Sequence, residues 1–209
     1  MTRAGRRRRR EGGVALLEIA ILSPIVFFLL FALLEFGLLF RDQLTAQDAV
    51  GDAARLGAIM GPDVATDGTN ADFQVIKTIR EGLGSIPPEW VQRIVIFRGN
   101  PAGAGSPTDQ LPATCKGGTA IAGRCNVYDP FSAFTAVEAG NVNFFNCAAN
   151  PTSPACSWQP ELRDDGPEPA NIQYLGVFVR IRRDSLTGVF ADTFTIDRAF
   201  VLRLEPGTV

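Results

Sequence analysis

The sequence predicts an α+β protein in which a long N-terminal helix, the first part of it transmembrane, precedes a small exported domain. Three observations lead to this prediction. An apolar run from Val14 to Phe40 passes directly into a helix-prone stem, residues 41–61. One amphipathic helical stretch and about three stretches with strand periodicity then follow in residues 62–209. Together they predict an antiparallel sheet of about three strands with a packing helix.

The apolar run from Val14 to Phe40 has the length and composition of a membrane-spanning helix. Its 27 residues make a helix of about 40 Å, whereas the hydrocarbon core of a bilayer is about 30 Å thick. Its only polar side chains are Glu18, Ser23 and Glu35. We therefore predict a single-pass membrane protein, and we expect Glu35, near the outer end, to extend its carboxylate to water.

The basic leader, residues 1–13, indicates how the chain is oriented. It holds six arginines and one glutamate, a charge of +5, so the rest of the chain carries −7 for a net charge of −2. The positive-inside rule places such a leader in the cytoplasm. We therefore expect the span in the cytoplasmic (inner) membrane and the exported domain in the periplasm or outside the cell. An acidic exported part gives no sign of nucleic-acid binding.

Two simpler interpretations of the N-terminal segment remain open. A cleaved secretory signal peptide has an apolar region of about 7–15 residues, which is shorter than this one, and the nearest small-x-small site lies only at residues 49–51. An uncleaved signal anchor explains the length and the basic flank but gives no reason for Glu18. A carboxylate within the bilayer is energetically unfavourable, so we expect Glu18 to have a partner of opposite charge.

The residues around Gly13 resemble a type IV prepilin cleavage site, in which a glycine ends a short basic leader and a glutamate, here Glu18, is the fifth residue after it. The continuation is more narrowly similar to the TadE-like family, the minor pseudopilins of the tight-adherence (Flp) pilus system. The resemblance covers roughly residues 6–61. It is carried by Leu17-Glu18-Ile19-Ala20-Ile21-Leu22-Ser23-Pro24, by Leu33-Leu34-Glu35-Phe36-Gly37, and by the alanine-rich stretch from Ala46 to Ala58 with Arg55.

This resemblance implies a non-enzymatic pilin-like subunit for assembly or function of a Flp pilus, and thereby for cell adhesion. A prepilin peptidase would cut between Gly13 and Val14, where a side-chain-free, extended backbone fits a peptidase cleft. Glu18 would serve in recognition or assembly, for example by pairing with the new α-amino group of Val14 on a neighbouring subunit. The implied partners are membrane lipid, the peptidase, other pilin-like subunits and pilus assembly proteins. No cofactor is expected.

Two features of the long helix follow from its residues. Pro24 frees the carbonyl of Ala20, for which the Ser23 hydroxyl is a candidate partner, and the resulting kink is either tolerated or used as a hinge in assembly. In the stem, small residues recur at a spacing of four and would let another helix approach closely, either from a second subunit or from this chain's own exported domain. These residues are Ala49, Ala53, Gly57 and Gly61, and the helix is expected to end near Gly61.

The exported domain is expected to hold one helix at residues 72–83 and strands at 90–98, 175–183 and 193–204. The helix has one apolar face, formed by Phe73, Ile76, Ile79 and Leu83. Between residues 99 and 171 periodicity is lost. This segment holds nine of the 14 prolines and all four cysteines, so we predict an irregular loop held together by disulfides.

The cysteines favour two short-range disulfides, Cys115–Cys125 and Cys147–Cys156, because an exported domain lies in a disulfide-permissive compartment. Four cysteines nevertheless allow three pairings. A zinc site is disfavoured, because the chain has no C-x-x-C motif and no histidine. The acidic cluster of Asp164, Asp165 and Glu168 is interpreted as a solvated loop and not as a calcium site. We therefore predict no metal site.

The absence of histidine also excludes Ser-His-Asp and Cys-His catalysis. The glycines of residues 99–105 do not form a phosphate-binding loop, because no Lys-Ser/Thr follows them. Two alternatives to a pseudopilin remain. One is an unprocessed, signal-anchored surface protein whose disulfide-stapled loop binds an external ligand. The other is a membrane-tethered enzyme that uses carboxylates alone, which would need a deep acidic pocket.

Overall fold

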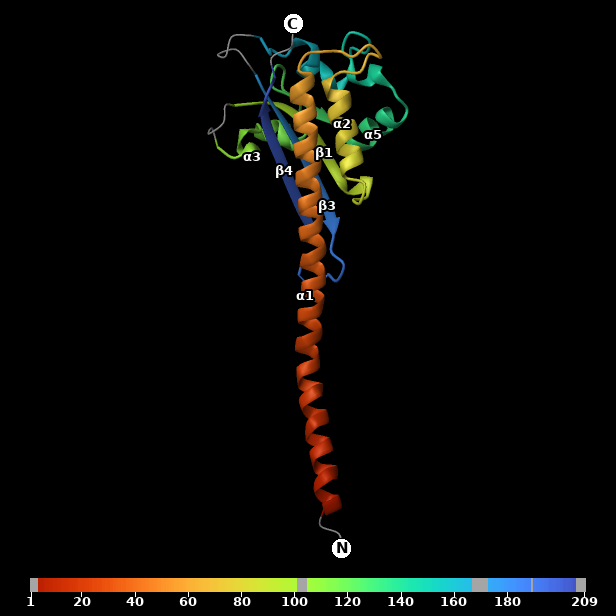
Figure 1. The fold of residues 1–209 in the computed structure, drawn as a ribbon, viewed down its shortest axis with the longest axis vertical. Helices are drawn as coiled ribbons and strands as arrows, with labels where there is room; N and C mark the ends of the chain where they lie inside the picture. The colour runs from red at the N-terminus through yellow and green to blue at the C-terminus, as the bar shows by residue number, and fades with distance from the viewer. Residues whose placement is uncertain (1–3, 101–104, 167–172, 189, 206–209) are drawn as a thin grey trace. The chain divides into compact units, whose positions relative to one another are not determined.

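The computed structural model describes residues 4–100, 105–166, 173–188 and 190–205, with side chains from residue 14 onward. The chain divides into two compact units. The first unit consists of residues 1–41 and 185–192, and the second of residues 42–184 and 193–209. Helix α1, Ala4–Met60, contributes residues to both (Figure 1). An α+β fold with a long N-terminal helix is therefore confirmed.

The first unit contains the part of α1 that is long and apolar enough to cross a membrane. Its apolar side chains are largely exposed, from Val14, 58% exposed, to Phe40, 62% exposed. A helix that exposes apolar side chains around its circumference is suited to lipid and not to water. The other part of this unit is the loop Ser185–Asp192, which joins strands β3 and β4.

The second unit is built on a four-stranded antiparallel sheet with the strand order β2-β1-β3-β4. The strands are β1 (Val91–Gly99), β2 (Cys125–Tyr128), β3 (Tyr174–Asp184) and β4 (Thr193–Arg203). The sequence predicted three of them, and β2 is the addition. Strand β2 lies within the segment expected to be irregular and pairs with β1 from Ile94↔Tyr128 to Phe97↔Cys125. Its four residues are too few to show an alternating pattern, which is why periodicity did not reveal it.

The described part of residues 99–171 is also more regular than expected. It contains short helices, several of which begin with a proline at the first or second position. Proline is tolerated there because its missing N–H is not needed in the first turn. Four of the prolines that suggested an irregular loop therefore start short helices or 3₁₀ turns instead, namely Pro107, Pro130, Pro154 and Pro160. These elements are α3 (Pro107–Gln110), α4 (Ala113–Gly117), α5 (Pro130–Glu138) and the 3₁₀ turns η2 (Val142–Phe145), η3 (Pro154–Ser157) and η4 (Pro160–Leu162).

Side chains from both faces of the sheet are buried. The face that carries Ile96, Val177 and Phe200 meets the stem part of α1, because a Cβ added at Gly51 would lie 3.9 Å from the ring of Phe200. Helix α2 (Ala71–Gly82) packs on the stem as well and buries the predicted apolar face. On the opposite face, a second apolar cluster surrounds one disulfide. It consists of Val95, Phe97, Leu111, Cys115, Cys125 and Phe178.

Candidate functional site

The residues that sequence analysis singled out for processing and assembly lie at the start of the apolar part of α1. The backbone of α1 is helical from Ala4, so the predicted cut between Gly13 and Val14 falls inside a helix, which would have to open to give the extended backbone that we expect in a peptidase cleft. Glycine in a helix interior is less favourable than alanine by about 1 kcal/mol. Gly12 and Gly13 therefore weaken α1 at this point.

Glu18 is exposed and surrounded by exposed apolar side chains. Within the residues whose side chains the structure describes, it has no hydrogen-bond or ion-pair partner. In a bilayer, neither water nor this part of its own chain would compensate the carboxylate. The geometry therefore leaves Glu18 available to a group from outside these residues.

Pro24 lies within α1, and the helix continues on both sides of it. The Ser23 hydroxyl donates a hydrogen bond to the carbonyl oxygen of Ala20, at 3.4 Å. This is the carbonyl that loses its helical partner because proline has no N–H. The side chain named from the sequence as a candidate partner thus occupies that position.

Glu35 does not reach water, contrary to our expectation. Only 1% of it is exposed. Its carboxylate accepts hydrogen bonds from the backbone N–H groups of Leu186, at 2.9 Å, and Thr187, at 3.0 Å, and from the Thr187 hydroxyl, at 3.0 Å. The loop that provides these donors lies 151 residues further along the chain. No local pattern around Glu35 could have indicated it.

The small residues of the stem face this chain's own exported part. Ala49 and Ala53 are buried. A Cβ added at Gly57 would lie 2.5 Å from the Leu175 side chain and 2.6 Å from that of Val75, so β3 and α2 approach too closely for any larger residue. The small residues were expected to pack either on a second subunit or on this chain's own exported domain, and in the structure they pack on the latter.

Gly61 differs from the other three small residues because it ends the helix. Its φ of +52° is the left-handed conformation that ends many helices, and its N–H bonds to the carbonyl of Gly57, at 3.1 Å. Helix α1 accordingly ends at Met60, where the Gly-Pro pair predicted its end.

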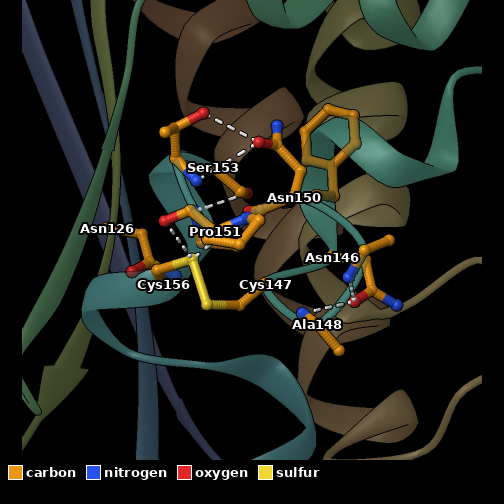
Figure 2. Close-up of a disulfide and its surroundings, with 12 residues drawn as sticks. Asn126, Asn146, Cys147, Ala148, Asn150, Pro151, Ser153 and Cys156 are labelled. Carbon is orange, nitrogen blue, oxygen red and sulfur yellow. Dashed lines mark hydrogen bonds between the residues drawn. A yellow bond between two sulfur atoms is a disulfide. The ribbon is translucent and has the colours of Figure 1, made fainter.

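The four cysteines form two disulfides, Cys115–Cys125 and Cys147–Cys156, the pairing that proximity in sequence favours. The first lies in the apolar cluster on the sheet. Figure 2 shows the second, which is enclosed by turns in which side chains bond to backbone N–H groups. The Asn146 amide oxygen accepts from Ala148, and the Ser153 hydroxyl oxygen accepts from Ala155. Both disulfides therefore hold short local segments together.

A buried polar network in the second unit was not foreseen. Asp72 and Arg163 form an ion pair at 2.6 Å, and both side chains are fully buried. The Tyr128 hydroxyl and the Asn126 amide each donate to Asp72, at 2.5 and 2.8 Å. Burial, together with the negative charge of Asp72, raises the pKa of Tyr128 well above its ordinary value, so its phenol stays neutral and donates. This network joins α2, β2 and the segment after η4.

The carboxylates of the second unit do not form a deep acidic pocket where the structure describes them. A hollow of about 390 Å³ lies between the stem and α2, lined in part by Asp48, Asp52 and Glu81. All three side chains are exposed, and Asp52 pairs with Arg55 at 3.1 Å. Among the described residues no group of three or more acidic, cysteine or histidine side chains could hold a metal ion. Of the sequence's acidic cluster, Glu168 lies outside those residues.

Comparison with known proteins finds a match for one part of the chain. No curated protein and no solved structure matches it. A family model described as TadE-like protein matches residues 13–55. The match begins at Gly13, includes Glu18, Pro24 and Glu35, and ends within the stem, so most of the second unit lies outside it. Among the described residues one helix is a candidate membrane span, which fits a single-pass membrane protein. The similarity of residues 13–55 to the TadE-like family suggests a Tad pilus-associated protein.

Proposed function

We propose that this protein is a minor pilin-like subunit, a pseudopilin, that acts in assembly or function of a Flp/tight-adherence pilus after a prepilin peptidase cuts it between Gly13 and Val14. The observation that carries the proposal is Glu18. It lies inside the TadE-like segment, five residues after the glycine that ends the leader. It is exposed among apolar side chains and has no partner in the described part of the chain.

Cleavage would change the electrostatic surroundings of Glu18 in two ways. It creates a positive α-amino group on Val14, four residues away and therefore on the same face of the helix. It also makes Val14 the first residue of α1, so that Glu18 comes to lie close to a helix N-terminus, where free N–H groups and the helix dipole favour a carboxylate. The amino group can pair with the Glu18 carboxylate of its own chain or with that of a neighbouring subunit. Pairing between subunits compensates both charges only in the assembly.

The proposed location follows from charge and from the disulfides. A leader of +5 favours a cytoplasmic N-terminus, with α1 in the inner membrane and the second unit in the periplasm or outside the cell. The two disulfides of the second unit suit an oxidising compartment. In this orientation Gly13 faces the cytoplasmic side of the membrane, which is where a prepilin peptidase would act.

A non-enzymatic function is part of the proposal. With no histidine in the chain, acid–base chemistry would depend on carboxylates, tyrosines or lysines. The carboxylates that line the hollow beside α2 are exposed to water, which leaves them without the desolvation that tunes a catalytic group. Asp72 is desolvated but is engaged by Arg163, Tyr128 and Asn126.

One observation favours the alternative of an unprocessed surface protein that binds an external ligand. Phe131 in α5 is 80% exposed and Leu162 in η4 is 72% exposed, both within the disulfide-stapled part of the second unit. Exposed large apolar side chains of this kind mark interaction sites when they lie together on a surface. This alternative requires no cleavage at Gly13, so a single experiment separates the two.

That experiment is the N-terminal sequence of the mature protein, isolated from cells that contain a prepilin peptidase and from cells that lack it. We expect a peptidase-dependent start at Val14. Gly13→Ala should abolish this start, whereas Gly12→Ala, one residue away in the same helix, is the matched control and should be cut. An intact leader in both kinds of cell would contradict the proposal and favour the signal-anchored surface protein.

A further inference from the structure

The loop Ser185–Asp192 lies against the membrane-spanning part of α1, although it belongs to the last part of the chain. Both are in the first compact unit. The ring of Phe190 lies between two phenylalanines of the helix, with its centroid 5.3 Å from that of Phe28 and 5.3 Å from that of Phe36. These contacts fix the level of the loop along α1.

That level is inside the apolar run. At helical rise, Phe36 lies about 6 Å and Phe28 about 18 Å before Phe40, where the run ends, so the Phe190 ring lies about 12 Å before that end. The whole run exceeds the hydrocarbon thickness by about 10 Å. Even if all of this excess projects on the loop's side, the Phe190 ring reaches the edge of the hydrocarbon region.

The hydrogen bonding of the loop suits a place without water. Four consecutive N–H groups each have an acceptor within the unit. Those of Leu186 and Thr187 bond to Glu35, that of Ser185 bonds to the Asp192 carbonyl, and that of Gly188 bonds to the Ser185 hydroxyl. Backbone in contact with lipid must be satisfied internally in this way, whereas a loop in water has no such requirement. Glu35, itself buried, is the central acceptor.

The loop exposes two large apolar side chains, and Asp192, at its end beside β4, is exposed as well. Leu186 is 65% exposed and Phe190 is 37% exposed. The N–H groups of residues 185–188 are therefore bonded to Glu35 and to the loop itself, whereas the side chains of Leu186 and Phe190 present aliphatic and aromatic surface outward. Such an arrangement is expected of a segment that contacts acyl chains at the membrane boundary.

We propose that the loop Ser185–Asp192 is a second membrane-contacting element of this protein. Leu186 and Phe190 insert at the boundary between acyl chains and headgroups, in the leaflet on the side of the second unit, and Glu35 holds the loop at that depth. The partner is the lipid bilayer. The proposal rests on α1 spanning the membrane, but it does not depend on cleavage at Gly13, so either proposal can fail without the other.

Site-directed spin labelling of the full chain tests the proposal. All four native cysteines are in disulfides, so a label reacts only with an introduced thiol. Leu186→Cys, Val26→Cys in the span and Leu162→Cys in the second unit all replace side chains that are at least half exposed, so the fold should accommodate them. Each labelled protein is placed in nanodiscs of phosphatidylethanolamine and phosphatidylglycerol. Collisions with oxygen, which concentrates in lipid, and with a polar nickel chelate are then measured.

We expect the label at position 186 to behave like that at position 26, with high oxygen accessibility and nickel accessibility at least several-fold below that at position 162. Nickel accessibility equal to that at position 162 would put the loop in water and overturn the proposal. Low accessibility to both reagents would mean that protein, such as a second copy of the chain, covers the loop, which overturns it as well.

Discussion

Two glutamates on the same apolar helix have opposite surroundings. Glu35 is 1% exposed and receives three hydrogen bonds from a loop of its own chain. Glu18, 17 residues earlier, is exposed and has no partner in the described part of the chain. A carboxylate in a membrane needs compensation, and the described part of the chain supplies it to Glu35 but not to Glu18. Glu35 therefore contributes to the fold of the first unit, whereas for Glu18 we propose compensation by the new α-amino group, in its own chain or in a neighbouring subunit.

The largest effect that this comparison predicts is on assembly. Glu18→Ala should lower processing or pilus assembly by about tenfold or more, because an interaction between buried charges is lost. The second unit should stay folded, since Glu18 belongs to the first unit. Leader cleavage and surface pili are measured by gel mobility and by microscopy, and thermal unfolding of the full chain in detergent reports the fold. Normal maturation and piliation in Glu18→Ala would show that neither processing nor assembly needs the Glu18 carboxylate.

Among carboxylates with partners in the chain, Asp72 should have the largest effect on stability. Asp72→Ala leaves the fully buried Arg163 guanidinium uncompensated and should lower the free energy of unfolding by about 3–5 kcal/mol. The matched control is Asp52→Ala, whose pair with Arg55 is exposed and should contribute less than about 1 kcal/mol. Denaturant unfolding of the full chain in detergent measures both. Equal, small losses would mean that the buried network does not support the fold.

Glu35→Ala should loosen the loop without affecting cleavage at Gly13, the reverse of what we expect for Glu18→Ala. The N–H groups of Leu186 and Thr187 lose their acceptor, so their hydrogen exchange should accelerate by about tenfold or more. Exchange at β1, in the centre of the sheet, serves as the internal reference. Unchanged exchange at positions 186 and 187 would show that Glu35 does not hold the loop.

The smallest predicted effect concerns Asp197, a partly exposed carboxylate. Hydrogen bonds from Arg180, and then from Lys116, lower the pKa of Asp197 against the opposing effect of burial. A pKa that is lower in the folded state stabilises the protein above the unfolded pKa, and this stabilisation is lost as the pH falls below about 4. Solvent screening limits it to about 1 kcal/mol or less. Asp197→Asn should therefore lower stability slightly at pH 7 and by a smaller amount at pH 3. A loss that is the same at both pH values would contradict this.

The sequence predicted those elements whose signal is local. The stripe of Phe73, Ile76 and Ile79 predicted α2, and alternation predicted β1, β3 and β4. Strand β2 is too short to alternate, and prolines that usually interrupt structure begin several short helices. Strand β2 forms because it pairs with β1, and the short helices form around a first turn that proline permits. Neither interaction produces a repeating pattern of apolar residues in the sequence.

The residues of the candidate site also differ in whether their role has a local signal in the sequence. Gly13, Val14 and Glu18 could be named from sequence because their spacing is a local motif, and the TadE-like match covers them. The first hydrogen-bond donor to Glu35 and the ion-pair partner of Asp72 could not, because they lie 151 and 91 residues away in the chain. Charge pairs between distant segments depend on the finished fold, and a single sequence does not reveal which partner a carboxylate will meet.

The hydrogen bonds of Glu35 also impose an order in time. Residue 35 leaves the ribosome 151 residues before Leu186, which at about 5–20 residues per second is a delay of roughly 8–30 s. During that interval α1 enters the membrane with a carboxylate whose donors have not yet been synthesised. The insertion machinery, or water at the membrane surface, must accommodate this charge until residues 186 and 187 have been synthesised and lie against α1. A chain that stops before residue 185 would have a complete α1 but none of these donors to Glu35. Quality control in the membrane could recognise such a chain by that charge.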